Sequence, residues 1–145
     1  MRPKAYNALF RRVRAKGHKY GAKGGYYCMS CFLPRPKPSK KDRACASKIC
    51  DGTVAYFGSK LEQRYWVKLK LMEKSGAIVY LKHQVRYPII INDKRIGTYI
   101  ADFTFYDKHD KKVRVLDAKG QEIEATRFRR KCAEACNDIE VEIVR

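Results

Sequence analysis

Long apolar runs are missing from this 145-residue sequence, and no apolar signal segment follows its first residues, Met1–Lys4. The first absence excludes a membrane-spanning helix, which needs about 20 consecutive apolar residues. The second argues against secretion. We therefore expect a cytoplasmic protein with no membrane partner. In that reducing compartment, six cysteines favour metal binding over disulfides.

Acidic residues are almost absent from the first 50 positions, where Asp42 is the only one beside fourteen lysines and arginines. Residues 51–145 hold fourteen acids against nineteen basic residues, and the whole chain has a formal net charge of +18. A compact domain with this charge repels itself unless a polyanion is near, so we expect nucleic acid as the partner rather than a merely soluble basic surface. The residues expected to contact phosphates are Arg11, Arg12, Arg14, Lys19, Lys23, Arg127, Arg130 and Lys131.

Proline is scarce, but three of the five prolines stand together within residues 34–38. Such a tract cannot form a helix or a central strand, so it is a loop. Cysteine pairs flank this loop as Cys28-x₂-Cys31 and Cys45-x₄-Cys50, and two close thiolate pairs are the usual way to build a tetrahedral zinc site. Four thiolates leave no open position, so this zinc would be structural. Unrelated free cysteines are the alternative, but the segment has little core of its own and metal binding would stabilise it.

Three regions are expected: a basic arm over residues 1–25, the four-cysteine zinc knuckle over 26–52, and an α/β core over 53–145. Helical spacing of Leu61, Tyr65, Leu69 and Met72 places the first core helix after Ser59, and Gly76 ends it. An antiparallel set followed by a crossover helix and a last strand predicts a mixed sheet with helices on both faces. The expected elements are helices over 60–75 and 125–136 and strands over 84–91, 95–106, 112–119 and 139–144.

Two strands carry the residues that suggest chemistry. Asp117 and Lys119 are two apart in the third strand, so they point to the same face. Asp102 is a lone acid in an apolar run of the second strand, where a charge is costly unless it is paired or metal-bound. Hairpin pairing sets Asp102 beside Asp117, and a divalent cation relieves the repulsion between adjacent carboxylates. Lys119 could then sit beside the attacking water and offset charge on a phosphate.

The arrangement Glu62 … Asp102 … Asp117-Ala118-Lys119 resembles the PD-(D/E)xK nucleases, which have the restriction-endonuclease-like αβββαβ core. Residues 19–23, 56–62, 81–84, 99–103 and 116–120 resemble an uncharacterised phage-borne branch of that superfamily. The resemblance implies that Glu62, Asp102 and Asp117 bind Mg²⁺ or Mn²⁺ and that Lys119 serves the water. The sequence departs from the pattern at Ala101, where the name-giving proline would stand.

Each of these residues also has a purely structural interpretation. Ser59 and Glu62 could form a capping box at the start of the helix. Asp102 and Asp117 could pair with basic side chains, and Lys119 could be a solvent-facing strand end. Gln84 either reaches the site, as a glutamine does in some relatives, or is an edge residue. The three histidines are scattered, and none is assigned to a metal.

We therefore predict a Mg²⁺-dependent DNA endonuclease. Analogy with small basic phage resolvases, which work as dimers, favours branched or junction DNA as the substrate, a homodimer, and the host cytoplasm for a phage-encoded chain. The alternative is a non-catalytic zinc-ribbon protein that binds nucleic acid and whose acids only stabilise the sheet.

Overall fold

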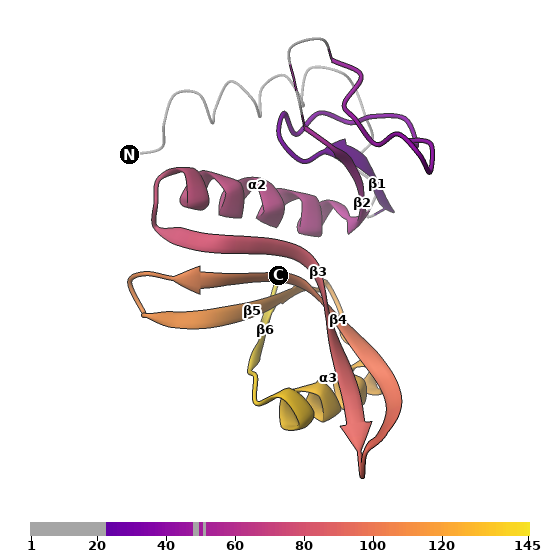
Figure 1. The fold of residues 1–145 in the computed structure, drawn as a ribbon, viewed down its shortest axis with the longest axis vertical. Helices are drawn as coiled ribbons and strands as arrows, with labels where there is room; N and C mark the ends of the chain where they lie inside the picture. Colours follow the sequence, from indigo (N-terminus) through magenta and orange to yellow (C-terminus); the bar gives the residue numbers. More distant parts are fainter. Residues whose placement is uncertain (1–22, 48–49, 51) are drawn as a thin grey trace.

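The part of the chain that the structure describes folds into a four-stranded mixed sheet, two helices and a separate two-stranded ribbon (Figure 1). This computed structural model describes residues 23–47, 50 and 52–145. Arg11, Arg12, Arg14 and Lys19 lie outside the described residues. None of the helices in the described ranges is long and apolar enough to cross a membrane.

From the first described helix onward, the elements follow the α-β-β-β-α-β order expected from the sequence. Strands β3, β4 and β5 pair antiparallel in that order, and β6 pairs parallel with β5, so the prediction of a mixed sheet is confirmed. The elements are β1 (Lys23–Cys28), β2 (Val54–Ser59), α2 (Lys60–Lys74), β3 (Ile78–Ile91), β4 (Lys94–Asp107), β5 (Lys112–Ala118), α3 (Glu124–Asn137) and β6 (Val141–Val144).

Helix α2 begins and ends where local chemistry requires. The Ser59 hydroxyl accepts a hydrogen bond from the Glu62 backbone N–H at 3.1 Å, which caps the first turn. Beyond the last turn, Gly76 has a φ of 80°, a left-handed conformation that glycine adopts without a steric penalty. Both ends therefore lie close to the positions predicted.

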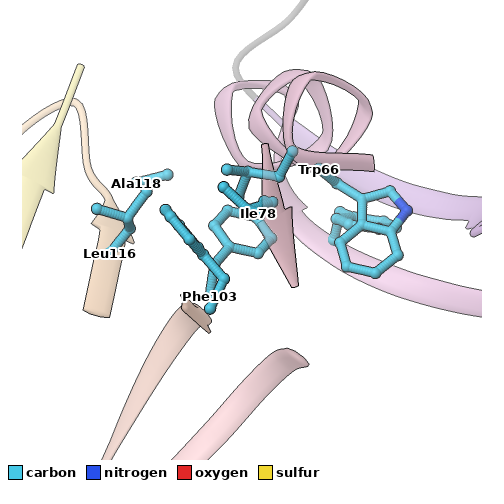
Figure 2. Close-up of a cluster of buried hydrophobic side chains, with 8 residues drawn as sticks. Trp66, Ile78, Phe103, Leu116 and Ala118 are labelled. Atoms are coloured by element: carbon cyan, nitrogen blue, oxygen red, sulfur yellow. The ribbon is translucent and has the colours of Figure 1, made fainter. Parts of the chain in front are cut away.

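The core between α2 and the sheet is a cluster of eight buried side chains (Figure 2). The Trp66 ring stacks on Phe103 of β4, with 6.2 Å between ring centroids. The indole N–H of Trp66 also donates to the Met29 carbonyl at 3.0 Å, which ties the cysteine segment to the core. The eight are Phe57, Trp66, Leu69, Ile78, Phe103, Phe105, Leu116 and Ala118.

A second cluster lies under α3, on the other face of the sheet. Val115 belongs to this cluster, whereas Leu116, its neighbour on β5, belongs to the cluster under α2. Because successive strand residues point to opposite faces, the two helices cover opposite faces, as predicted. The members of this α3 cluster are Ile89, Tyr99, Ala101, Val115, Ala133 and Val141.

The β3–β4 ribbon bends sharply near Gln84 and Asp102. Tyr99 and Ala101 enter the α3 cluster, but Phe103 enters the α2 cluster, although alternate residues of a flat strand share one face. Gln84 lies between the pairs His83↔Phe103 and Val85↔Ala101, which places it opposite Asp102, and its φ is 56°. In Figure 1 the start of β3 runs beside α2, and the rest of the ribbon turns away toward α3.

Some predicted element boundaries were wrong. Strand β3 begins at Ile78 rather than Gln84, because a register shift after Val79 and a φ of 59° at Tyr80 interrupt the alternation that marks a strand. The paired strands β1 and β2 were missed altogether. Strand β1 begins at Lys23, inside the expected arm, and its partner lies beyond the cysteine loop, so no local pattern signals the pairing.

Candidate functional site

The four cysteine sulfurs of the cysteine segment form one compact group. All four Sγ atoms lie within 4.8 Å of one another. The Cys28–Cys50 sulfur distance is 3.6 Å and the Cys31–Cys45 distance is 3.9 Å. A tetrahedral zinc ion with Zn–S bonds of about 2.3 Å places its sulfurs about 3.8 Å apart. The cluster could therefore hold a structural zinc ion.

Backbone geometry builds this cluster from two distant pairs. The N–H groups of Ser30 and Cys31 donate to the Cys28 sulfur at 3.4 and 3.5 Å, so the first pair wraps around a tight turn. The Cys45 N–H donates to the Gly52 carbonyl at 2.8 Å, which brings the second pair beside the first. A Cβ at Gly52 would lie 2.5 Å from the Ser30 hydroxyl and 2.8 Å from the Cys28 sulfur, so the close approach requires glycine.

The surroundings shift the pKa values of two of the thiols in opposite directions. Burial raises the pKa of the Cys28 thiol to about 12. A hydrogen bond from the Ser47 backbone, with help from Arg35, lowers the pKa of Cys45 to about 7. A bound cation would favour the thiolate form of every member, since only thiolates ligate zinc.

The predicted acidic residues come from three different elements and meet at the bend of the β3–β4 ribbon. Glu62 of α2 is buried, with one oxygen accepting from the Gly58 N–H at 2.7 Å. Its other oxygen lies 2.8 Å from His83 Nε2 and accepts from Gln84 Nε2 at 2.8 Å. Only half of the capping box forms, because Glu62 bonds Gly58 rather than the Ser59 N–H.

Asp102 is held between β3 and β5. One oxygen accepts from Gln84 Nε2 at 3.1 Å, and the other accepts from the Ala118 N–H at 2.8 Å. Regular pairing of β4 with β5 stops at Phe103↔Leu116, so this side chain continues the contact between the strands where the backbone ladder ends. Gln84 thus links the carboxylates of Glu62 and Asp102 through a single amide nitrogen.

Asp117 is buried on β5 and shares one oxygen between two donors, the Tyr99 hydroxyl and the Lys119 ammonium. The Lys119 side chain is 25% exposed, and its ammonium lies 5.6 Å from the centre of the Tyr99 ring. Burial, and then the hydrogen bond to Asp117, raises the pKa of Tyr99 well above its usual range, so the hydroxyl stays a donor.

The three carboxylates of Glu62, Asp102 and Asp117 lie near enough to repel one another. Burial, followed by repulsion from Glu62, raises the pKa of Asp102 to about 8 from an ordinary value of 3.8, although the Ala118 N–H opposes the change. Asp117 adds to the repulsion.

The three carboxylates are more widely spaced than the cysteine sulfurs. Within the described residues, only the cysteines bring three or more His, Cys, Asp or Glu ligand atoms within 4.8 Å of one another.

The basic residues predicted on the last helix have unequal surroundings. Arg130 donates to Glu122 at 2.9 and 3.2 Å and to Glu134 at 3.1 Å, so internal ion pairs occupy its guanidinium. Arg127 lies 3.6 Å from Glu122 with 58% of its side chain exposed, and Lys131 is exposed. The remaining described residue of the predicted set, Lys23, pairs through its backbone with Ser59.

A shallow hollow of about 190 Å³ lies beside Lys119. Arg129 of α3 lines it and, unlike Arg127 and Arg130, has no acidic partner within 4 Å among the residues that the structure describes. Arg129 belongs to the basic stripe of the last helix that the sequence predicts to meet the phosphate backbone. The lining residues are Thr98, Tyr99, Ile100, Lys119, Thr126 and Arg129.

Sequence reasoning missed two residues that touch the acids. His83 was assigned to no site, yet its ring packs against Phe57 and Trp66 and its Nε2 faces Glu62. Tyr99 contacts Asp117 from a strand position that the apolar pattern marks only as core. Gln84, for which two roles remained open, reaches both Glu62 and Asp102.

These features define a mixed α/β protein with a four-cysteine cluster suited to metal binding. A family model described as "Protein of unknown function (DUF1064)" matches residues 41–143, and the chain belongs to this family. The matched range includes Glu62, Asp102, Asp117 and Lys119, but it begins after the first cysteine pair. No curated protein and no solved structure matches the chain.

Proposed function

We propose that this protein is a divalent-metal-dependent nuclease of the PD-(D/E)xK type that hydrolyses DNA phosphodiester bonds. One observation carries the proposal: Glu62, Asp102 and Asp117, from three elements, gather at the bend with Lys119 beside them. The α-β-β-β-α-β order and the mixed sheet are consistent with the resemblance of these residues to that superfamily.

The donor set suits Mg²⁺ or Mn²⁺. Carboxylate oxygens are the ligands these ions prefer, and Mg²⁺ is commonly held by one or two carboxylates while water and phosphate oxygens complete its shell. Asp102 and Asp117 would be the main ligands, with Glu62 as an additional one. Burial, and then repulsion from Glu62 and Asp117, raises the pKa of Asp102, and a bound cation would relieve that repulsion. Gln84 would have to release Glu62 or Asp102 if both were to bind the ion.

The protein's own groups would orient the reaction. A bound divalent ion would polarise the phosphate and activate a water molecule. Lys119 would offset the charge that develops on the phosphate, and its ion pair with Asp117 holds the ammonium in place. Tyr99 would fix the carboxylate of Asp117 through its hydroxyl, and Ala118 would fix Asp102 through its N–H.

The remaining parts of the chain would serve binding. A net charge of +18 favours a polyanionic partner, and the exposed Arg127 and Lys131 lie on the same helix as Arg129, which lines the hollow beside Lys119. The cysteine cluster would hold a structural zinc ion that stabilises the segment packed on Trp66. Branched or junction DNA and a homodimeric assembly, both taken from the analogy with resolvases, belong to the same proposal.

A second function is favoured by a different observation. Each of the three carboxylates already has hydrogen-bond partners within the chain, and Asp117 is paired with Lys119. These contacts are what a purely structural polar network would show. The protein would then be a zinc-containing nucleic-acid-binding protein without catalytic activity.

Cleavage assays separate the two functions. The purified chain is incubated with plasmid, linear duplex and four-way-junction DNA in Mg²⁺ or Mn²⁺, with parallel reactions in EDTA. We expect metal-dependent cleavage that both Asp117→Asn and Lys119→Met abolish. DNA affinity in EDTA should stay within about twofold of the wild type in Asp117→Asn, because this change removes no basic group. Binding without cleavage on every substrate would favour the second function, and cleavage by both variants at the wild-type rate would reject this site.

A further inference from the structure

Arg35 is the one basic side chain of the described residues that directly contacts the cysteine sulfurs. Its Nε donates to the Cys45 sulfur at 3.2 Å, and one terminal nitrogen donates to the Cys31 sulfur at 3.5 Å. The guanidinium therefore touches one cysteine from each pair.

The backbone holds Arg35 in this position. The Arg35 N–H donates to the Tyr26 carbonyl at 2.9 Å, and the preceding Pro34 forms a bridge with Tyr27. Both partners belong to β1, the strand that ends at Cys28. The Arg35 side chain is half-buried, whereas Lys37 and Arg43 are exposed.

Charge gives this contact its physical meaning. Four thiolates around one zinc ion leave the centre with two excess negative charges, and such sulfurs remain nucleophilic. A guanidinium is always charged and presents several N–H donors in a rigid fork. Hydrogen bonds from Arg35 withdraw electron density from the sulfurs of Cys31 and Cys45. They also orient both sulfurs toward the position that the zinc ion would occupy. Groups outside the ligand shell tune metal affinity in this way.

We propose that Arg35 is a positioning residue of the zinc centre, which bridges the two cysteine pairs and protects Cys31 and Cys45 from electrophiles. The proposal rests on zinc binding by the four cysteines and does not depend on nuclease activity.

Zinc retention and site-resolved alkylation test it on the full-length chain. Arg35→Ala and Arg35→Lys are compared with Arg43→Ala as the control. Arg43 is exposed and lies two residues before Cys45, so its substitution removes the same charge close to the cluster. Zinc affinity is measured by competition with a chromogenic chelator. Alkylation of each cysteine by iodoacetamide is followed by mass spectrometry.

We expect Arg35→Ala to weaken zinc binding about tenfold, the lower end of the range for such outer-shell contacts. Alkylation of Cys31 and Cys45 should quicken more than that of Cys28 and Cys50. Arg35→Lys should restore part of the protection, and Arg43→Ala should behave like the wild type.

Three results would overturn the proposal. One is equal zinc affinity in Arg35→Ala and Arg43→Ala, and another is a uniform rise in alkylation at all four cysteines, which indicates a merely structural role. The third is a wild-type chain that binds no zinc, and DNA cleavage by that chain would leave the nuclease proposal standing. If Arg35→Ala does not fold, Arg35→Gln replaces it in the same comparison.

Discussion

The positive φ of Gln84 predicts which of two substitutions at this position, glycine or alanine, gives the larger free energy of unfolding. Gln84 has a φ of 56° in the middle of a strand, where a side chain with a Cβ is strained by about 1–2 kcal/mol. Gln84→Gly and Gln84→Ala both lose the hydrogen bonds to Glu62 and Asp102, so that loss cancels when the two variants are compared. Only the glycine variant is relieved of the strain, and its unfolded chain regains about 0.5–1 kcal/mol of entropy.

The difference between these two terms favours Gln84→Gly over Gln84→Ala by about 0.5–1 kcal/mol. Urea unfolding followed by circular dichroism measures this difference, and thermal melting should show a gap of about 2 °C. Lys82 is the control, because it is exposed on the same strand and is not among the described residues with positive φ. There the order should reverse, with Lys82→Ala more stable than Lys82→Gly. If Gln84→Ala equals or exceeds Gln84→Gly, the bend is not held in a strained conformation and the argument fails.

Two further predictions concern the zinc segment and the DNA surface. Cys28→Ser should release about one zinc ion per chain, measured by elemental analysis, and lower amide protection in β1 and β2 but not in β4; unchanged zinc content would exclude Cys28 as a ligand. Arg129→Ala should weaken DNA binding in EDTA and reduce the salt slope by about one, whereas Arg130→Ala should lower stability through its lost pairs with Glu122 and Glu134 and leave the slope unchanged. Equal salt slopes for wild type and Arg129→Ala would remove the hollow from the DNA surface.

Local patterns were sufficient to predict most of the core. The turn at Asn92 and Asp93 was predicted from residue type, and both residues have the positive φ that a tight hairpin needs. Helix α3 was predicted at 125–136 and spans Glu124–Asn137. Both elements are specified by residues near each other in the sequence, which is why a single sequence suffices.

The remaining parts of the fold were not predicted, because they depend on long-range contacts and on backbone irregularities. The β1–β2 ribbon joins segments on either side of the cysteine loop, and Gly24–Gly25 reads locally as a linker. Trp66 was left out of the predicted core, although its ring stacks on Phe103 and its N–H holds Met29.

The contacts of the candidate site likewise fall into those that the sequence predicts and those that only the fold shows. Counting residues from the hairpin turn predicts that Asp102 lies opposite Asp117. The observed pairing stops one residue short of that pair, at Phe103↔Leu116. His83 contacts Glu62 just after the register shift between Val79 and Lys82, and no sequence pattern marks that shift. Arg130 has the same residue type as the exposed Arg129, and only the fold shows that acids surround it. Metal binding by the carboxylates stays a prediction.

The most direct measurement of that prediction is Mn²⁺ binding to the zinc-loaded protein by electron paramagnetic resonance. Mn²⁺ prefers oxygen ligands and should not displace zinc from thiolates. We expect about one Mn²⁺ per chain, with affinity reduced more than about tenfold in Asp102→Asn and in Asp117→Asn, because loss of a ligand costs more than an outer-shell change. Asp93→Asn, an exposed acid in the hairpin turn, should bind as the wild type does. If all four proteins bind Mn²⁺ equally, or none does, the carboxylates at the bend do not form a divalent-metal site.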